Sequence, residues 1–503
     1  MTNPHWYYAP NPLTRYLPTF ETIEEIGEAL RFNPLEGLDI RSLSIIQRHE
    51  LLVAEKTPLH PSQRSLETSM TIYNMHRHSL RMRNPTVPQG RRLVNDALTK
   101  GLEDGNFIKQ PPAPGACLLV IKGITGTSKS VTVKHTLRLL GDQVIRHSEE
   151  PAALWKAATQ ISYLYVGMSH DGSRGGLLNA ILLGIDEILG TSFATDLPKK
   201  YRTLDRLAGA VISKLHSLYL GVLIIDEIQL LNLVHSEHAE KVHLFLLNLA
   251  NSGIPLVLIG NPLGFTWLPA YTQNLTRSLE RPQAFFHPHG AVGEDDDDWD
   301  MVYQGIRAYY LLDDPPSDEE GCSVTLKRRS GGIPRIGLTL WSMAQLNVLL
   351  DGGRQVTPED IEDVYRDENF DDIRAICDGF ANRDPLLLLK WSKTDIPVEY
   401  YARIWRKSIP KPDTEDAPSA DAGSSTPVDK DSPPSKPRKQ KSAAAKLKAQ
   451  ETRERNKQAE RDALRDTLPA EDMRREGCKM HAMASFAELM KQIEGLSKPS
   501  AEE

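Results

Sequence analysis

The segment from Gly123 to Ser130, Gly-Ile-Thr-Gly-Thr-Ser-Lys-Ser, constrains the fold of this chain more than any other. It follows the apolar run 116–121, which is typical of a buried parallel strand, and it precedes residues 131–140, whose pattern predicts a helix. A strand, a tight loop and a helix in this order bring backbone N–H groups and a helix N-terminus around one point, which favours an anion. The segment therefore predicts an α/β fold with a phosphate-binding loop.

The loop nearly matches the pattern G-x-x-x-x-G-K-[ST], with Ser128 in place of the second Gly. Lys129 would reach the β- and γ-phosphates, and the Ser130 hydroxyl would ligate Mg²⁺. Gly in such a loop allows close backbone approach or a positive φ, so Ser128 adds strain and weakens nucleotide affinity if φ is positive there. The alternative is an ordinary strand, turn and helix rich in small residues. The residues predicted to bind the nucleotide in this segment are Gly123, Thr125, Gly126, Thr127, Ser128, Lys129, Ser130 and Val131.

Two further apolar runs end in polar residues, where α/β proteins place their ligand-binding groups. Residues 221–225 are followed by Asp226, a candidate for the Mg²⁺ shell, and by Glu227, a candidate general base for an attacking water. Residues 255–260 are followed by Asn261, which could hydrogen-bond the γ-phosphate or the lytic water. The alternatives are a charged strand end in solvent and a plain Asn-Pro turn. Combined with the loop, these residues predict ATP and Mg²⁺ as cofactors.

Composition narrows the class of protein. The 503 residues carry a net charge of −7, so any contact with nucleic acid must be local rather than spread over the chain. The four Cys are scattered without a C-x-x-C pair, which argues against a zinc site or a disulfide framework and indicates a reducing cytoplasm. The N-terminus lacks a signal-peptide pattern, and no run of about eighteen apolar residues predicts a membrane span.

Four regions follow from the composition along the chain. Residues 1–100 form a Pro-punctuated N-terminal extension, with helical periodicity at 23–30 and 66–80, that would pack on the core and bind a partner. Residues 101–320 form the α/β nucleotide-binding domain, with an acidic, solvated insertion at about 291–320. Residues 321–395 form a helical lid, in which Thr357 and Pro358 begin a helix as N-cap and first position.

Residues 396–503 predict a flexible tail rich in Pro, Ser, Asp and Lys. Within it, residues 436–457 hold nine Lys or Arg and two Glu, a local charge of +7. This segment either attracts a phosphate backbone or an acidic protein, or is simply a solvated tail. Residues 486–493 predict a short amphipathic docking helix.

These motifs together resemble a known family. The loop, Asp-Glu-Ile-Gln at 226–229, Gly-Asn-Pro at 260–262 and Ser-Gly-Gly-Ile-Pro-Arg at 330–335 are similar to AAA+ ATPases of the TnsC/TniB type, the ATP-dependent regulators of Tn-type DNA transposition. The resemblance spans roughly residues 60–380 and extends to Arg-Asn-Pro at 83–85 and Ser-His-Asp-Gly-Ser at 169–173. It implies an AAA+ P-loop NTPase fold, with a parallel sheet flanked by helices and followed by a small helical lid.

The resemblance also implies roles for single residues. Lys129 and Ser130 match Walker A, Asp226 and Glu227 match Walker B, Asn261 matches the polar sensor, and Arg335 matches a lid arginine that reaches the γ-phosphate of its own subunit. Arg277, with Arg281 in reserve, matches the finger that reaches a neighbour's nucleotide; the alternative is a surface ion pair. Relatives bind the duplex backbone inside a spiral of subunits, and Arg174, Arg202 and Thr203 lie in segments that resemble their DNA-binding loops; the alternative is solvated loop residues.

The function expected from the resemblance is an ATP-dependent DNA-binding ATPase that forms a homo-oligomeric ring or helical filament on double-stranded DNA. It would couple a target-selection protein to the transposase. One alternative is a nucleotide-dependent scaffold with little hydrolysis, because Ser128 departs from the motif. Another is a helicase loader or replication initiator, which shares the motifs. Initiators often carry a winged helix after the lid, and residues 396–503 are too polar and irregular for one.

Overall fold

In the computed structural model, the described residues are 6–54, 57–103, 117–233, 236–267, 283–293 and 298–409. The chain divides into two units, 1–412 and 413–503, and every described residue belongs to the first. The basic segment 436–457, the docking helix 486–493, Arg277 and Arg281 lie outside the described residues. Within the described part, no helix is both long enough and apolar enough to cross a membrane.

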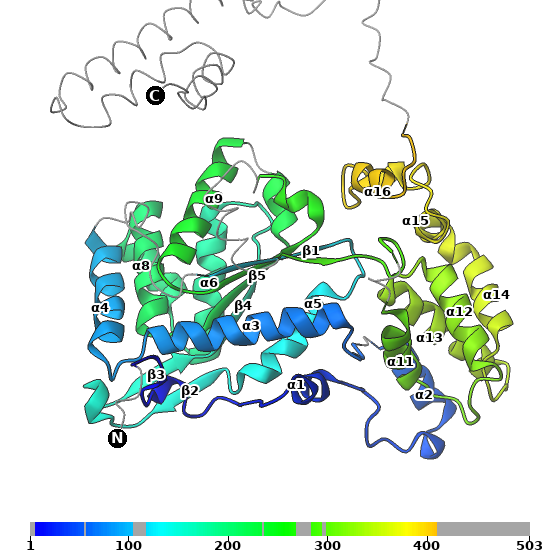
Figure 1. The fold of residues 1–503 in the computed structure, drawn as a ribbon, viewed down its shortest axis with the longest axis horizontal. Coiled ribbons are helices and arrows are strands. Elements are labelled where there is room, and N and C mark those ends of the chain that lie inside the picture. Colours follow the sequence, from blue (N-terminus) through cyan, green and yellow to red (C-terminus); the bar gives the residue numbers. More distant parts are fainter. Residues whose placement is uncertain are drawn as a thin grey trace, which may run out of the picture. The chain divides into compact units, whose positions relative to one another are not determined.

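The centre of the fold is a parallel sheet of five strands in the order β4-β5-β6-β1-β7 (Figure 1). The strands are β1 (Leu118–Gly123), β4 (Tyr163–Gly167), β5 (Val222–Asp226), β6 (Leu256–Gly260) and β7 (Ala284–Phe286). The three apolar runs recognised in the sequence are β1, β5 and β6, which are neighbours in the sheet. A separate antiparallel pair is formed by β2 (Val144–His147) and β3 (Ala158–Ile161). The predicted parallel sheet is confirmed.

Both faces of the sheet are covered by helices because alternate side chains of each strand point to opposite faces. Leu223 and Ile225 pack in one cluster with α6, α8 and α9, whereas Val222 and Ile224 pack in another with α1, α3 and α5. The bounds of these and the two remaining core helices are α1 (Ile23–Leu30), α3 (Gln63–Met82), α4 (Pro88–Glu103), α5 (Lys129–Thr136), α6 (Arg174–Leu189), α7 (Phe193–Lys200), α8 (Leu204–Ser217) and α9 (Ser236–Asn251). The N-terminal helices α1 and α3 therefore belong to the core.

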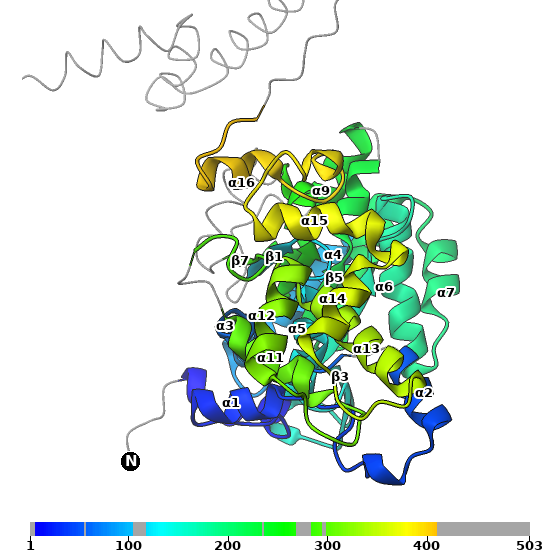
Figure 2. The same ribbon diagram turned by 90° about the vertical axis from the view of Figure 1, so that its right-hand side faces the viewer.

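A second layer of helices follows the sheet in sequence (Figure 2). It consists of α11 (Trp299–Ala308), α12 (Glu319–Ser330), α13 (Pro334–Leu350), α14 (Pro358–Arg366) and α15 (Asp371–Ala381). Thr357 caps α14 in a reciprocal capping box with Asp360, at the position that the sequence predicted. The N-terminal helix α2 (Ile45–Val53) joins this layer, and the Tyr309 hydroxyl donates to the Leu51 carbonyl at 2.5 Å. The N-terminal region thus packs on both layers.

Two segments for which the sequence predicted no regular structure contain helices. The acidic insertion at about 291–320 contains α11, whose Trp299 and Tyr303 are 3% and 6% exposed, so the expectation of a solvated loop is wrong there; residues 294–297 lie outside the described residues. The predicted tail begins with α16 (Val398–Ile404), which buries Val398 and Tyr401 completely. In both segments, burial of the apolar side chains stabilises the helix. The charged side chains stay on its outer face, where they remain solvated.

Two buried histidines predict a loss of stability in acid. Burial holds the pKa of His76 and His216 at about 3, and the neighbouring Arg83 guanidinium contributes in both cases. Their rings contact the hydroxyls of Ser162 and Ser252 at 3.0 and 3.3 Å. Because the unfolded chain binds these protons near pH 6.5 and the folded chain does not, stability is complete above that pH and falls below it, by about 1.4 kcal/mol per pH unit for each ring.

Urea unfolding at pH 7 and pH 5 should therefore show a free energy of unfolding lower at pH 5 by about 4 kcal/mol from this pair. His216→Asn should remove about half of that pH dependence. His170→Asn, at an exposed histidine, should leave it unchanged. An unaltered slope in His216→Asn would show that this ring does not cause the effect.

Candidate nucleotide-binding site

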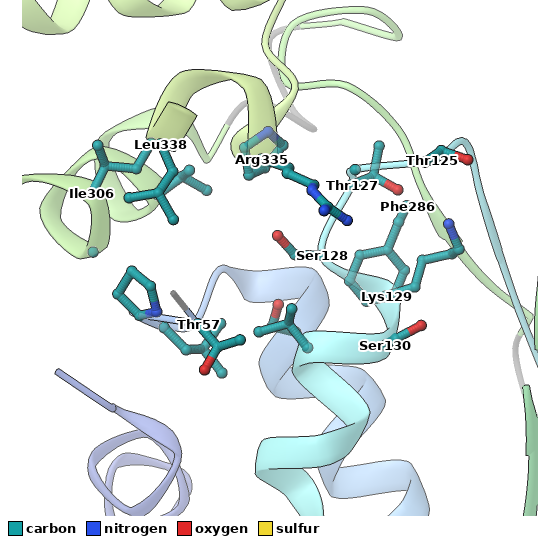
Figure 3. Close-up of a pocket in the computed structure, with 18 of the residues that line it drawn as sticks. Thr57, Thr125, Thr127, Ser128, Lys129, Ser130, Phe286, Ile306, Arg335 and Leu338 are labelled. Atoms are coloured by element: carbon teal, nitrogen blue, oxygen red, sulfur yellow. The ribbon is translucent and has the colours of Figure 1, made fainter. Parts of the chain in front are cut away.

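A cavity of about 700 Å³ opens at the carboxyl ends of β1, β5 and β6, between the sheet and the second helical layer (Figure 3). Parallel sheets place ligands at this edge because helix N-termini and strand-end loops converge there. The residues that line it include Thr125, Gly126, Thr127, Ser128, Lys129, Ser130, Val131, Asp226, Glu227, Asn261 and Arg335. The cavity thus brings together the residues that the sequence assigned to the nucleotide and to Mg²⁺, apart from Gly123 and Arg277.

Side chains next to one another donate to a carbonyl group of the loop between β1 and α5. The Lys129 ammonium and the Thr127 hydroxyl each donate to the Ile124 carbonyl at 2.8 Å. Gly123 is in close contact with β7, since a Cβ there would lie 2.6 Å from the Phe286 carbonyl oxygen. Burial lowers the pKa of Lys129 from its usual value, and the carboxylates of Asp395, Asp226 and Glu227 partly oppose that effect. The ammonium is therefore a partly desolvated cation, which interacts more strongly with a phosphate than one in water.

Ser128 adopts the left-handed backbone conformation, for which strain was expected. Its φ is 66° and its ψ is 14°, and its side chain forms no capping hydrogen bond to α5. A non-glycine residue in this region costs about 1–2 kcal/mol, because its Cβ crowds the following carbonyl oxygen. Figure 3 places its hydroxyl on the cavity side of the loop. The conditional prediction of backbone strain at this position is confirmed.

Ser128→Gly should relieve this strain and tighten nucleotide binding. We expect the free energy of unfolding to rise by about 1 kcal/mol and the ATP dissociation constant to fall several-fold. Urea unfolding and titration calorimetry with Mg²⁺ measure the two effects. Leu154→Gly is the matched control, because Leu154 has a φ of 61° outside the loop and should gain stability alone. Equal affinity of Ser128→Gly and the parent chain would show that the strain does not affect binding.

Ser130 and Asp226 form a pair that fits a magnesium ion. The Ser130 hydroxyl donates to Asp226 Oδ2 at 2.8 Å, so a hard hydroxyl oxygen and a carboxylate oxygen already lie together. Mg²⁺ keeps several waters and takes one or two protein oxygens at nucleotide sites. Among the described residues, no group of three or more His, Cys, Asp or Glu could hold a metal ion without other ligands. The pair suits Mg²⁺ bound together with phosphates.

Tyr165 also contacts this pair, and the sequence did not predict that contact. Its hydroxyl also donates to Asp226 Oδ2, and burial, followed by the proximity of that carboxylate, raises the pKa of Tyr165. Tyr165 pairs with Ile224 in the register of β4 and β5, so it faces the same side of the sheet as Asp226. Only strand pairing could reveal this contact, because no local pattern around Tyr165 points to Asp226.

Glu227 and Asn261 are joined by Gln229, whose role the sequence also left unassigned. The Gln229 side-chain amide donates to the Glu227 carboxylate, and its carbonyl oxygen accepts from the Asn261 N–H at 3.2 Å. Glu227 is exposed, with a positive φ of 61°, at the end of β5. A non-glycine residue held in such a conformation is often found where a side chain is aimed at a ligand. The two predicted strand-end residues are thus positioned by one shared neighbour.

Arg335 enters the cavity from the second helical layer. It lies near the start of α13, and its backbone N–H donates to the Gly126 carbonyl at 3.2 Å. Its guanidinium points toward the loop (Figure 3). This arrangement is compatible with a lid arginine reaching a phosphate. Arg277 and its reserve Arg281 lie outside the described residues, so their assignment stays a prediction.

The three predicted DNA-contacting residues lie on neighbouring helix N-termini. Arg174 begins α6, and Thr203 caps α8 by accepting from the Arg206 N–H. Arg174 donates to Asp205 at 2.7 Å, which links the two helix starts, and its side chain is only 18% exposed. Arg202 is exposed beside them. Of the three, Arg202 is the freest to meet a ligand, whereas Arg174 is engaged in an ion pair.

The chain matches the AAA domain family over residues 114–267. Among solved structures it is similar to Drosophila ORC bound to DNA, with 15% identity, 80% of this chain and 86% of that chain covered, and a TM-score of 0.36. It is similar to Aeropyrum pernix ORC1 in complex with DNA, with 17% identity, 62% and 67% covered, and a TM-score of 0.36. It is also similar to the Thermotoga maritima RuvB Holliday junction branch migration motor, with 12% identity, 63% and 83% covered, and a TM-score of 0.29. No curated protein matches the chain.

The family match covers β1, the phosphate-binding loop, the Asp226-Glu227 strand end and the Asn261 strand end. The loop residues and both strand ends line one cavity at the edge of a five-stranded parallel sheet. The chain therefore has the AAA+ P-loop NTPase fold, and its residues 114–267 match the AAA domain model.

Proposed function

We propose that this protein is an ATP-dependent DNA-binding AAA+ ATPase that assembles on duplex DNA and couples target selection to a transposase. The observation that carries the nucleotide part is the 2.8 Å contact between Ser130 and Asp226, with Lys129 next to them in the loop. It joins the two motifs on which a nucleoside triphosphate and Mg²⁺ depend. The transposition part depends on the sequence motifs that resemble TnsC/TniB-type regulators.

Each cavity residue has a distinct task in this proposal. Lys129 binds the β- and γ-phosphates, while Ser130 and Asp226 hold Mg²⁺, which neutralises phosphate charge when bound. Glu227 accepts a proton from the attacking water as general base. Asn261 orients the γ-phosphate or that water, and Arg335 stabilises negative charge on the transferred group, as a planar guanidinium does well.

Assembly follows if the nucleotide lies at a boundary between subunits. Arg277 of one subunit would then reach the phosphate bound by Lys129 of the next, so that ATP joins the two and hydrolysis loosens them. Exposed Arg202, beside the N-termini of α6 and α8, would contact the duplex backbone together with Arg174 and Thr203. Such phosphate contacts give binding that is largely independent of sequence and weakens with salt. A cytoplasmic location remains a prediction from the cysteine pattern.

The strained backbone at Ser128 favours a second candidate, a scaffold that binds nucleotide but hydrolyses it poorly. A distorted loop would still hold two subunits together through ATP, but it would misplace the γ-phosphate relative to Glu227. Such a protein would assemble on DNA and remain there.

Phosphate release and DNA binding, measured on the full chain with Mg²⁺ and ATP, test the proposal and separate the two candidates. The ATPase predicts ATP-dependent binding to duplex DNA together with phosphate release that duplex DNA alters. The scaffold predicts ATP-dependent binding with no phosphate release. Duplex binding that is the same with and without ATP would contradict both.

A further inference from the structure

The segment that follows the second helical layer reaches back into the nucleotide cavity. The Thr125 N–H of the phosphate-binding loop donates to Asp395 Oδ2 at 3.0 Å. The side-chain amide of Asn261 donates to the Thr394 carbonyl at 2.9 Å. Two adjacent residues thus occupy a backbone donor of the loop and the polar side chain at the end of β6. Both contacts come from a segment that follows the five helices of the second layer in sequence.

Packing fixes where this segment lies. Ile396 and Val398 are buried in one cluster with Ile124 of the loop and Ile333 at the start of α13. The N–H groups of residues 394, 395 and 396 all donate to the Trp391 carbonyl, at 3.2, 3.1 and 3.0 Å. The Asp395 carboxylate is therefore held beside the loop by a tight turn and an apolar anchor.

The Asp395 carboxylate lies at a site that would attract other anions as well. The loop N–H groups and the Lys129 ammonium form a positive site that would attract phosphate, and Asp395 is one of the carboxylates that act on Lys129. Its other oxygen, Oδ1, is buried with no hydrogen-bond donor among the described residues. A buried acceptor without a donor destabilises the arrangement that contains it. The contact is thus strong enough to form and poor enough to be exchanged for a better anion.

The contacts also place Asp395 at one end of the expected triphosphate. Lys129 reaches the β- and γ-phosphates, and Asn261 is the residue expected at the γ-phosphate, so the segment that binds Thr125 and Asn261 lies at the γ end. A nucleoside diphosphate would leave this end free. A triphosphate would bring two like charges together there, which in a site of low dielectric is costly.

We propose that Asp395 is a specificity-determining residue that opposes binding of a nucleoside triphosphate, but not of a diphosphate, at this site. The γ-phosphate takes the Thr125 N–H from Asp395, the turn at 391–396 withdraws, and Thr394 releases the amide of Asn261 to face the phosphate. The inference depends on the proposed nucleotide-binding function and adds to it a residue that senses the third phosphate.

Titration calorimetry on the full chain with Mg²⁺ tests this, using ADP and the non-hydrolysable triphosphate adenylyl imidodiphosphate. Asp395→Asn keeps the shape and an acceptor for Thr125 but removes the charge. We expect it to tighten triphosphate binding about tenfold while ADP binding stays within about twofold. Asp395→Glu keeps the charge and should keep the parent preference. Glu399→Gln removes the same charge from an exposed position on α16 and should change neither affinity.

The outcomes distinguish the inference from the function on which it depends. If the folded parent chain binds neither nucleotide, the proposed function fails and the inference fails with it. If the parent chain binds both, but Asp395→Asn shifts the two affinities equally or not at all, the inference is overturned and nucleotide binding stands. Should Asp395→Asn fold poorly in urea titrations, Asp395→Ser carries the same expectation.

Hydrogen exchange gives a second reading on the parent chain. The peptide covering 389–401 should exchange faster with the triphosphate than with ADP, because only the third phosphate displaces the turn. Equal protection with both nucleotides would contradict that movement.

Discussion

Lys129→Ala abolishes ATP-dependent DNA binding if the nucleotide links subunits as proposed. The ammonium is the loop cation in the cavity, and burial around it strengthens its attraction to a phosphate. Charge-assisted hydrogen bonds contribute about 1.5–3 kcal/mol each, so losing those of Lys129 should weaken ATP binding on the order of 100-fold. Titration calorimetry measures the ATP affinity, and co-sedimentation with duplex DNA measures assembly with and without ATP.

Lys134→Ala is the control for that measurement. Lys134 is an exposed residue of the same helix, α5, and its removal changes the net charge of the chain by the same amount. It should leave ATP affinity and assembly within about twofold of the parent, because an exposed charge is screened by solvent. Unchanged ATP-dependent assembly in Lys129→Ala would refute the coupling between nucleotide and DNA.

Glu227→Gln should stop hydrolysis and preserve assembly. A general base contributes about 10²–10⁴-fold to rate, and the amide cannot accept a proton from water at neutral pH. The substitution keeps the size of the side chain and an oxygen that can accept from Gln229, so the geometry around Asn261 is retained. We expect phosphate release to fall by at least about 100-fold and the DNA-bound assembly to persist after free ATP is removed.

Phosphate release and the dissociation rate from labelled duplex DNA measure these two effects. Glu187→Gln, at an exposed position on α6, is the matched control and should behave as the parent chain. Rapid release of DNA by Glu227→Gln would show that another group activates the water.

Much of the site could be predicted because it is local in sequence. The residues from Gly123 to Ser130 run from the end of β1 through a tight loop into the first turn of α5, and the shape of that loop follows from its glycine and from the strand and helix beside it. Asp226 and Asn261 were found because each ends an apolar run, and parallel strands gather their ends at one edge of a sheet. The conditional statement about Ser128 was also local, because the need for a positive φ is a property of the loop itself.

The remaining contacts could not be predicted because they join distant parts of the chain. Tyr165 reaches Asp226 through strand pairing, and Asp395 reaches Thr125 across 270 residues of sequence. The prediction of a loose segment from 396 onward failed at its start for the same reason. Ile396 and Val398 look unremarkable in a polar stretch until Ile124 and Ile333 provide a surface that buries them.

The amino-acid sequence by itself determined the parallel α/β core, the phosphate-binding loop and the acidic strand end, because backbone preference and apolar periodicity act over a few residues. Only the tertiary structure decided that α3 would cover one face of the sheet, that Tyr165 would share Asp226 with Ser130, and that a carboxylate from beyond the second helical layer would lie at the loop. Those contacts depend on which apolar surfaces remain to be buried once the local elements have formed. That in turn depends on the packing of the whole described unit rather than on any short segment.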